Sequence, residues 1–162
     1  MSSFLPKSFK LVPREKKTFP VTILKANESA EGQPAFVVTV REGTVDDLNL
    51  LAEEQAAEAP TKGFRPGSPL AKKARLSWRE RYAGKFFIDW TGLTKGNFDH
   101  LNRGDMVLEA PEGSTEQIPF SLEAAVYLLS HTDSTEFGDM IQDAMWNKAR
   151  EATAKVEEAK NA

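Results

Sequence analysis

The sequence predicts an α+β protein, with a small antiparallel β unit and one helix at the front and a mainly α-helical lobe at the rear. Short apolar runs and alternating apolar residues occupy residues 1–42, which is typical of strands. Apolar residues at helical spacing dominate after residue 70. Between these parts, residues 59–69 hold three prolines and two glycines, as a linker would. The predicted division is a β unit with one helix at 1–58, the linker at 59–69, a helical lobe at 70–157 and a frayed tail at 158–162.

Three strands are expected in the front unit. Residues 9–12 and 21–24 are short apolar runs, and residues 36–41 alternate as a half-buried strand does. The polar residues 26–34 suit a hairpin connection that is longer than a tight turn. Three strands are the smallest sheet that is stable on its own, so the unit has enough strands to form one.

A surface helix is expected over residues 45–58. Thr44 is followed three residues later by Asp47, so a hydroxyl and a carboxylate can satisfy two free backbone N–H groups at the helix start. Only a thin apolar stripe follows, which indicates a helix that rests on the sheet with most of its surface in water.

The rear lobe begins with a predicted helix at 70–82. Residues 86–90 follow, three of which are aromatic, and they indicate either a strand or a buried turn. Residues 94–117 contain three glycines and an acidic second half, so we interpret them as an insertion with at most a short helix near 98–102.

Two helices are expected at the C-terminal end. Ser121 is a helix cap for residues 122–129. A longer helix should cover about 135–157, and its apolar stripe consists of Phe137, Met140, Ile141, Ala144, Met145 and Ala149.

Charge is arranged in blocks, although the net charge is only -3. Residues 1–25 carry six Lys or Arg, residues 28–58 carry eight acids and residues 62–85 carry eight Lys or Arg, each block against a single residue of the other sign. Such blocks either pair within the fold or attract a partner, and the small net charge favours pairing within the fold.

The chain has no cysteine, which excludes disulfides and thiolate sites and favours an intracellular location. Its amino end has no apolar run before the first charge, and no stretch approaches ~18 consecutive apolar residues. We therefore expect no signal peptide, no membrane span and a cytoplasmic protein.

No group of ionisable residues has the spacing of an active site, so we expect a protein that is not an enzyme and that binds no cofactor or metal. His100 and His131 each lie near an aspartate, as a general base would, but no nucleophile motif accompanies them. The acids of residues 105–116 lack the spacing of a calcium loop, and the glycines match no phosphate-binding motif. Binding of another protein is the function that remains.

Basic and aromatic residues are interleaved in residues 62–85. Three interpretations stay open: nucleic acid contact, pairing with an acidic protein or with the chain's own acidic block, and a solvated helix face. The acidic pI of about 5.5 disfavours nucleic acid. The candidate contact residues are Lys72, Lys73, Arg75 and Arg79.

Two aromatic motifs lie in the C-terminal half, Ile88-Asp89-Trp90-Thr91-Gly92-Leu93 and Ile118-Pro119-Phe120-Ser121-Leu122-Glu123. Together with Leu128, Leu129, Phe137 and Ile141, they resemble the phage tail assembly chaperones, in which a tryptophan with a nearby glycine precedes a helix start of the Ile-Pro-Phe-Ser type. The resemblance spans residues 86–150. In that family the turn between the motifs is usually brief, whereas residues 94–117 intervene in this chain.

The resemblance implies a non-catalytic protein in the infected bacterium. It would keep the long, apolar tape measure protein soluble while tail tube subunits are recruited, using apolar grooves and helix faces. The residues expected to serve core and binding face together are Trp90, Phe120, Tyr127, Phe137, Ile141 and Trp146. Two alternatives stay open, a structural tail or connector subunit of the virion and a nucleic-acid-binding regulator using residues 62–85. Homo-oligomer formation is also open.

Overall fold

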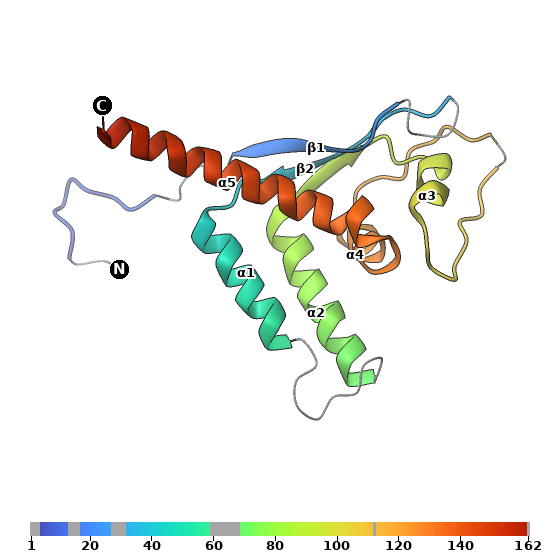
Figure 1. The fold of residues 1–162 in the computed structure, drawn as a ribbon, viewed down its shortest axis with the longest axis horizontal. Coiled ribbons are helices and arrows are strands. Elements are labelled where there is room, and N and C mark those ends of the chain that lie inside the picture. The colour runs from blue at the N-terminus through green and yellow to red at the C-terminus, as the bar shows by residue number, and fades with distance from the viewer. Residues whose placement is uncertain (1–3, 13–16, 27–31, 59–68, 112, 162) are drawn as a thin grey trace.

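The structure, a computed structural model, describes residues 4–12, 17–26, 32–58, 69–111 and 113–161. In these ranges the chain forms one three-stranded antiparallel sheet, five α-helices and one short 3-10 helix. The predicted α+β class is therefore confirmed. The sheet forms one layer, and most of the helices lie on one side of it (Figure 1).

The sheet has the order β1 (Thr18–Leu24), β2 (Phe36–Arg41) and β3 (Phe87–Thr91), with β2 in the middle. Val38 of β2 pairs with Trp90 of β3, and both side chains are buried beneath the helices. Along β2 the side chains alternate between buried and half-buried, as predicted for a strand with one covered face.

The prediction of a first strand at residues 9–12 is wrong, because these residues are exposed and lie outside the sheet. The third strand is β3, so the strand interpretation of residues 86–90 is confirmed. The physical reason is buried area. Phe87 and Trp90 both place large rings in the core, whereas residues 9–12 offer a single ring.

The five α-helices are α1 (Val45–Glu58), α2 (Pro69–Phe86), α3 (Lys95–Leu101), α4 (Leu122–His131) and α5 (Gly138–Asn161). α1 and α4 begin where the sequence predicts them, and α2 continues four residues beyond the predicted end. α2 packs against α1 and α4, while α5 packs against α1 and β1.

Both predicted helix caps are present. The Asp47 N–H donates to Thr44 Oγ1 at 3.1 Å, and the Thr44 N–H donates to Asp47 Oδ2 at 3.0 Å, which is a reciprocal capping box. At α4 the Ala124 N–H donates to Ser121 Oγ at 3.1 Å. These local bonds explain why the two helix starts could be read from the sequence.

One hydrophobic core links the front and rear parts of the chain. Phe36 of β2 stacks on Phe137 at 6.3 Å between ring centroids, and Phe137 meets Phe87 edge-on at 6.1 Å. Tyr82 is fully buried and donates its hydroxyl to Met145 Sδ at 3.8 Å. The predicted units at 1–58 and 70–157 thus share a sheet and a core, and the predicted linker lies outside the described residues except for Pro69.

The predicted insertion, residues 94–117, contains α3 and is tied to the sheet. Fully buried Asn97 donates its amide Nδ2 to the carbonyls of Pro34 and Gly92, at 2.8 and 2.7 Å. Gly92 has a φ of +83°, and a Cβ there would lie 1.8 Å from the Ala35 oxygen, so only glycine fits this turn. The turn and α3 therefore hold the loop before β2 in place.

α5 begins three residues later and ends four residues later than predicted, because residues 134–136 form a separate 3-10 turn. Ile141, Met145 and Ala149 are its buried residues. From Arg150 to Asn161 every residue is exposed, and the helix extends away from the body (Figure 1).

Candidate partner-binding surfaces

Three of the predicted binding residues are core residues. Trp90, Phe137 and Ile141 are buried, and Trp90 donates its Nε1 hydrogen to the Ile118 carbonyl at 2.9 Å. These side chains present almost no surface to a partner in this structure. Their role in the fold is to join β3, the segment before α4 and α5 to one interior.

The other three predicted aromatic residues are partly buried at the edge of the core. Phe120 meets Trp90 edge-on at 5.0 Å, and the guanidinium of Arg150 lies 5.5 Å from the Trp146 ring. Tyr127 stacks on Phe98 at 5.7 Å. Tyr127 also donates its hydroxyl to Asn102 Oδ1 at 3.1 Å. Only their outer edges are available for binding.

The described part of the basic stretch, residues 69–85, lies on α2, next to the acidic α1. Arg81 Nε lies 3.9 Å from Glu54 Oε2, so the two charge blocks meet within the fold, as the sequence favoured. Lys73 is exposed and Arg79 is half-buried. The side chains of Lys72 and Arg75, and all of residues 62–68, lie outside the described part.

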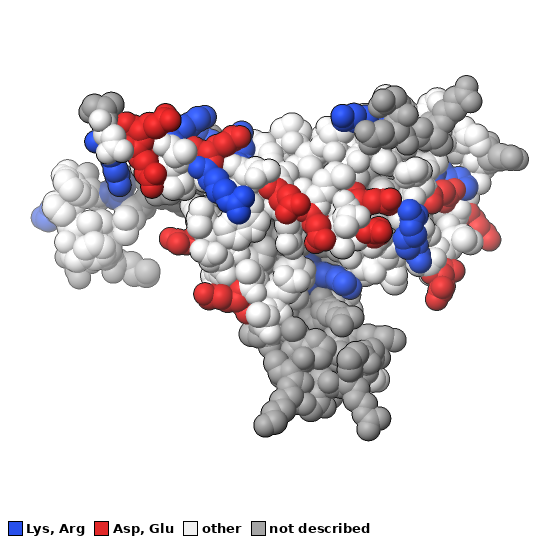
Figure 2. All heavy atoms as spheres, in the orientation of Figure 1, with Lys and Arg blue, Asp and Glu red and all other residues white. Residues whose placement is uncertain are grey.

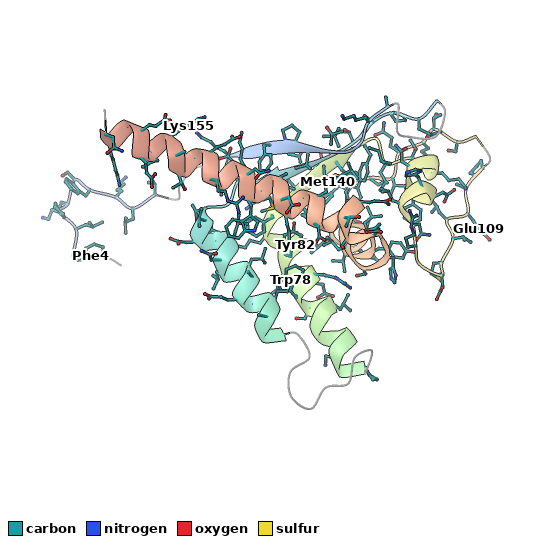
Figure 3. The ribbon with its side chains drawn as sticks, viewed as in Figure 1. Phe4, Trp78, Tyr82, Glu109, Met140 and Lys155 are labelled. Atoms are coloured by element: carbon teal, nitrogen blue, oxygen red, sulfur yellow. The ribbon has the colours of Figure 1, made fainter. Side chains whose placement is uncertain are left out.

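Two aromatic residues in the described part of the basic stretch, Trp78 and Tyr82, face inward. Trp78 donates its Nε1 hydrogen to the Leu51 carbonyl at 3.3 Å and stacks on Tyr82 at 5.3 Å (Figure 3). Both rings are buried, so neither can stack on a nucleic acid base in this conformation. Burial, together with the charge of Asp139, raises the pKa of Tyr82 well above its usual value.

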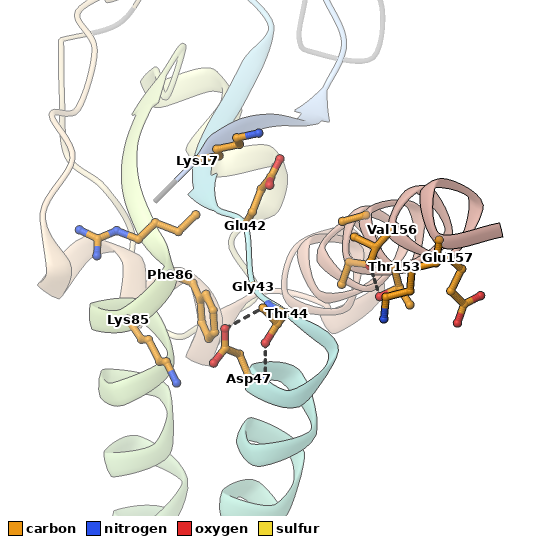
Figure 4. A pocket seen from close by; sticks show the side chains of 14 residues that line it. Lys17, Glu42, Gly43, Thr44, Asp47, Lys85, Phe86, Thr153, Val156 and Glu157 are labelled. Atoms are coloured by element: carbon orange, nitrogen blue, oxygen red, sulfur yellow. Dashed lines mark hydrogen bonds between the residues drawn. The ribbon is translucent and has the colours of Figure 1, made fainter. Parts of the chain in front are cut away.

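A groove of about 890 Å³ lies between Lys17, which directly precedes β1, the end of β2, the start of α1, the end of α2 and the part of α5 from Ala149 onward (Figure 4). Its apolar floor is formed by Phe86 and Ala149, which are buried, and by Ala152 and Val156 of α5. Val156 is 54% exposed. Gly43 lets the backbone before α1 lie close to the ring of Phe86, since a Cβ at residue 43 would lie only 3.2 Å from that ring.

Charges of both signs surround this floor. The lining contains the cations Lys17, Arg41, Lys85 and Lys160 and the acids Glu42, Asp47 and Glu157. Figure 2 shows the same mixture of signs along the exposed part of α5. An apolar floor with a mixed-charge rim is suited to a peptide or helix that carries both apolar and charged side chains.

Sequence reasoning missed this groove, because its lining comes from segments far apart in the chain. One signal was present. The apolar stripe of α5 continues past Ala149 through Ala152 and Val156 at helical spacing, before the tail predicted to fray at 158–162.

The described residues contain no group of three or more His, Cys, Asp or Glu placed to hold a metal ion. His131 lies at the end of α4 with its ring 4.6 Å from that of Tyr127, and His100 lies in α3. Hydrogen bonds from the side chain and then the backbone of Thr135 lower the pKa of Asp133. In the described part of the chain, every helix is too short or too polar to cross a bilayer.

No known protein family, curated protein or solved structure matches this chain.

Proposed function

We propose that this chain is a non-catalytic bacteriophage tail assembly chaperone that acts in the cytoplasm of the infected bacterium. It binds the tape measure protein and keeps it soluble while tail tube subunits are recruited. The observation that carries the proposal is the groove beside the outer half of α5, added to the motifs of residues 86–150.

The groove suits an amphipathic helix. Such a helix places its apolar face on an apolar floor and its charged side chains on the rim, and the floor here is Phe86, Ala152 and Val156. The exposed turns of α5 add a second helix surface beside it. The mixed charges of the rim orient the partner and set the rate of encounter.

Co-expression with the tape measure protein tests this proposal. The wild-type chain should shift the tape measure protein from the pellet to the soluble fraction. Ala152→Glu in the groove should abolish the effect, because it places a carboxylate on the apolar floor. Ala154→Glu is the matched control, since Ala154 is on the same helix, is exposed and does not line the groove.

A tape measure protein that aggregates equally with and without the chain would overturn the proposal. Equal rescue by both variants would show that the groove is not the binding site.

One observation favours the alternative of a structural tail or connector subunit. Four apolar residues of the segment 4–12 are exposed, namely Phe4, Phe9, Leu11 and Val12, and permanent assemblies cover such surfaces. Mass spectrometry of purified particles separates the two functions, because a chaperone is absent from the finished particle and a structural subunit is present.

A further inference from the structure

We propose that copies of this chain associate head to tail, with the N-terminal segment (residues 4–12) of one copy packed on the acidic loop (residues 105–111) of the next. This contact is separate from the groove and does not depend on the proposed function.

Both surfaces expose large apolar side chains. Among the described residues, the six most exposed large apolar side chains are Phe4, Phe9, Leu11 and Val12 of the segment and Met106 and Val107 of the loop, at 63–79% exposed. Every other such side chain in the described ranges is less exposed than these, Val156 included. Apolar side chains grouped in this way usually mark an interaction surface.

The two surfaces have opposite charge. The N-terminal segment contains Lys7 and Lys10 and no acid, whereas the acidic loop contains Asp105 and Glu109 and no base. Each surface therefore repels a second surface of its own kind and attracts the other. This complementarity favours a contact between segment and loop over segment with segment or loop with loop.

The acidic loop is anchored at its base. The Arg103 N–H donates to the His131 carbonyl at 2.7 Å, and the Gly104 N–H donates to Asn102 Oδ1 at 3.0 Å. Asn102 Nδ2 also donates to the Met106 carbonyl at 2.7 Å. The exposed side chains of Met106 and Val107 are thus presented on a supported backbone, which lowers the entropy lost when a partner binds.

The two surfaces lie at opposite ends of the molecule. Figure 3 places Phe4 at one end of the long axis and Glu109 at the other. A segment therefore reaches the loop of a neighbouring copy. Because the two contacting surfaces differ, each added copy leaves one segment and one loop free, and growth continues until a ring closes or a filament forms.

Sedimentation velocity over a range of protein concentrations tests this inference. At low salt the mean mass should rise with concentration, and at 1 M salt the rise should shrink because exposed charges are screened. The double substitutions Phe9→Ser with Leu11→Ser and Met106→Ser with Val107→Ser should each give monomers. Leu50→Ser with Leu76→Ser removes exposed apolar area elsewhere and should associate like the wild type.

Mixing the two monomeric variants identifies the geometry. Each retains one intact surface, so the mixture should form dimers that do not grow further. A wild-type chain that is monomeric at every concentration would overturn the inference, and so would a mixture that stays monomeric. Circular dichroism spectra equal to those of the wild type establish that both variants fold.

Charge exchange supplies a second test. Lys7→Glu with Lys10→Glu should prevent association, and adding Asp105→Lys with Glu109→Lys to the same chain should restore it, since both surfaces are then reversed. Failure of the fourfold variant to associate would contradict the charge complementarity.

Discussion

The two halves of α5 share one helical periodicity but have different surroundings. Residues 138–149 place Ile141, Met145 and Ala149 in the core, whereas residues 150–161 are exposed. Apolar positions continue at the same spacing through Ala152 to Val156, and these two residues line the groove instead of packing in the core. Periodicity therefore identifies the apolar face of a helix, and the elements beneath that face decide whether it forms core or binding surface.

Truncation of a core residue in the inner half should have the largest effect. Ile141→Ala is expected to lower the free energy of unfolding by about 2–5 kcal/mol, because it removes buried methyl groups and leaves a cavity. Urea denaturation measures the change. A loss below about 1 kcal/mol would contradict the tight packing of this half.

Removal of the buried amide that holds the α3 turn should have the next largest effect. Asn97→Ala deletes two donors and leaves the carbonyls of Pro34 and Gly92 without them, which should cost about 2–3 kcal/mol. Asn49→Ala is the control and should cost little, because Asn49 is exposed on α1. Equal stability of the two variants would mean that the amide is not essential.

The buried hydroxyl of Tyr82 should make the free energy of unfolding depend on pH in the alkaline range. Because the pKa of Tyr82 is raised in the folded chain above the usual 10.0, the unfolded chain loses this proton first. The contribution of Tyr82 to the free energy of unfolding is fully present below pH 10. Above pH 10 this contribution should fall by up to about 1.4 kcal/mol per pH unit. Urea denaturation between pH 9 and 11 should show a smaller decrease for Tyr82→Phe. An unchanged slope would exclude Tyr82 as the cause.

The matched change in the outer half should have the smallest effect on stability. Val156→Ala should change the free energy of unfolding by less than about 0.5 kcal/mol, because Val156 is 54% exposed. If the groove binds the tape measure protein, the same variant should weaken that binding, as a pull-down with purified proteins would measure. A large loss of stability would show instead that the outer half supports the fold.

Much of the fold could be predicted from the sequence, and little of the binding surface. The α+β class and the starts of α1 and α4 follow from alternation, periodicity and caps such as Thr44 and Ser121. The predicted strand at 9–12 is absent from the sheet, because a short apolar run does not specify which strand it would pair with. Trp90, Phe137 and Ile141 were expected to serve core and binding face together, and the structure places them in the core.

The sequence by itself determined the local features of this protein: which segments contain the long helices, where capping side chains start α1 and α4, and which blocks carry which charge. These features depend on side chains within a few residues of each other. Only the tertiary structure decided that β3 completes the sheet, that Phe36 stacks on Phe137, and that the groove forms beside α5. Each of these joins residues far apart in the chain, and such contacts depend on the packing of the whole core, which no local pattern specifies.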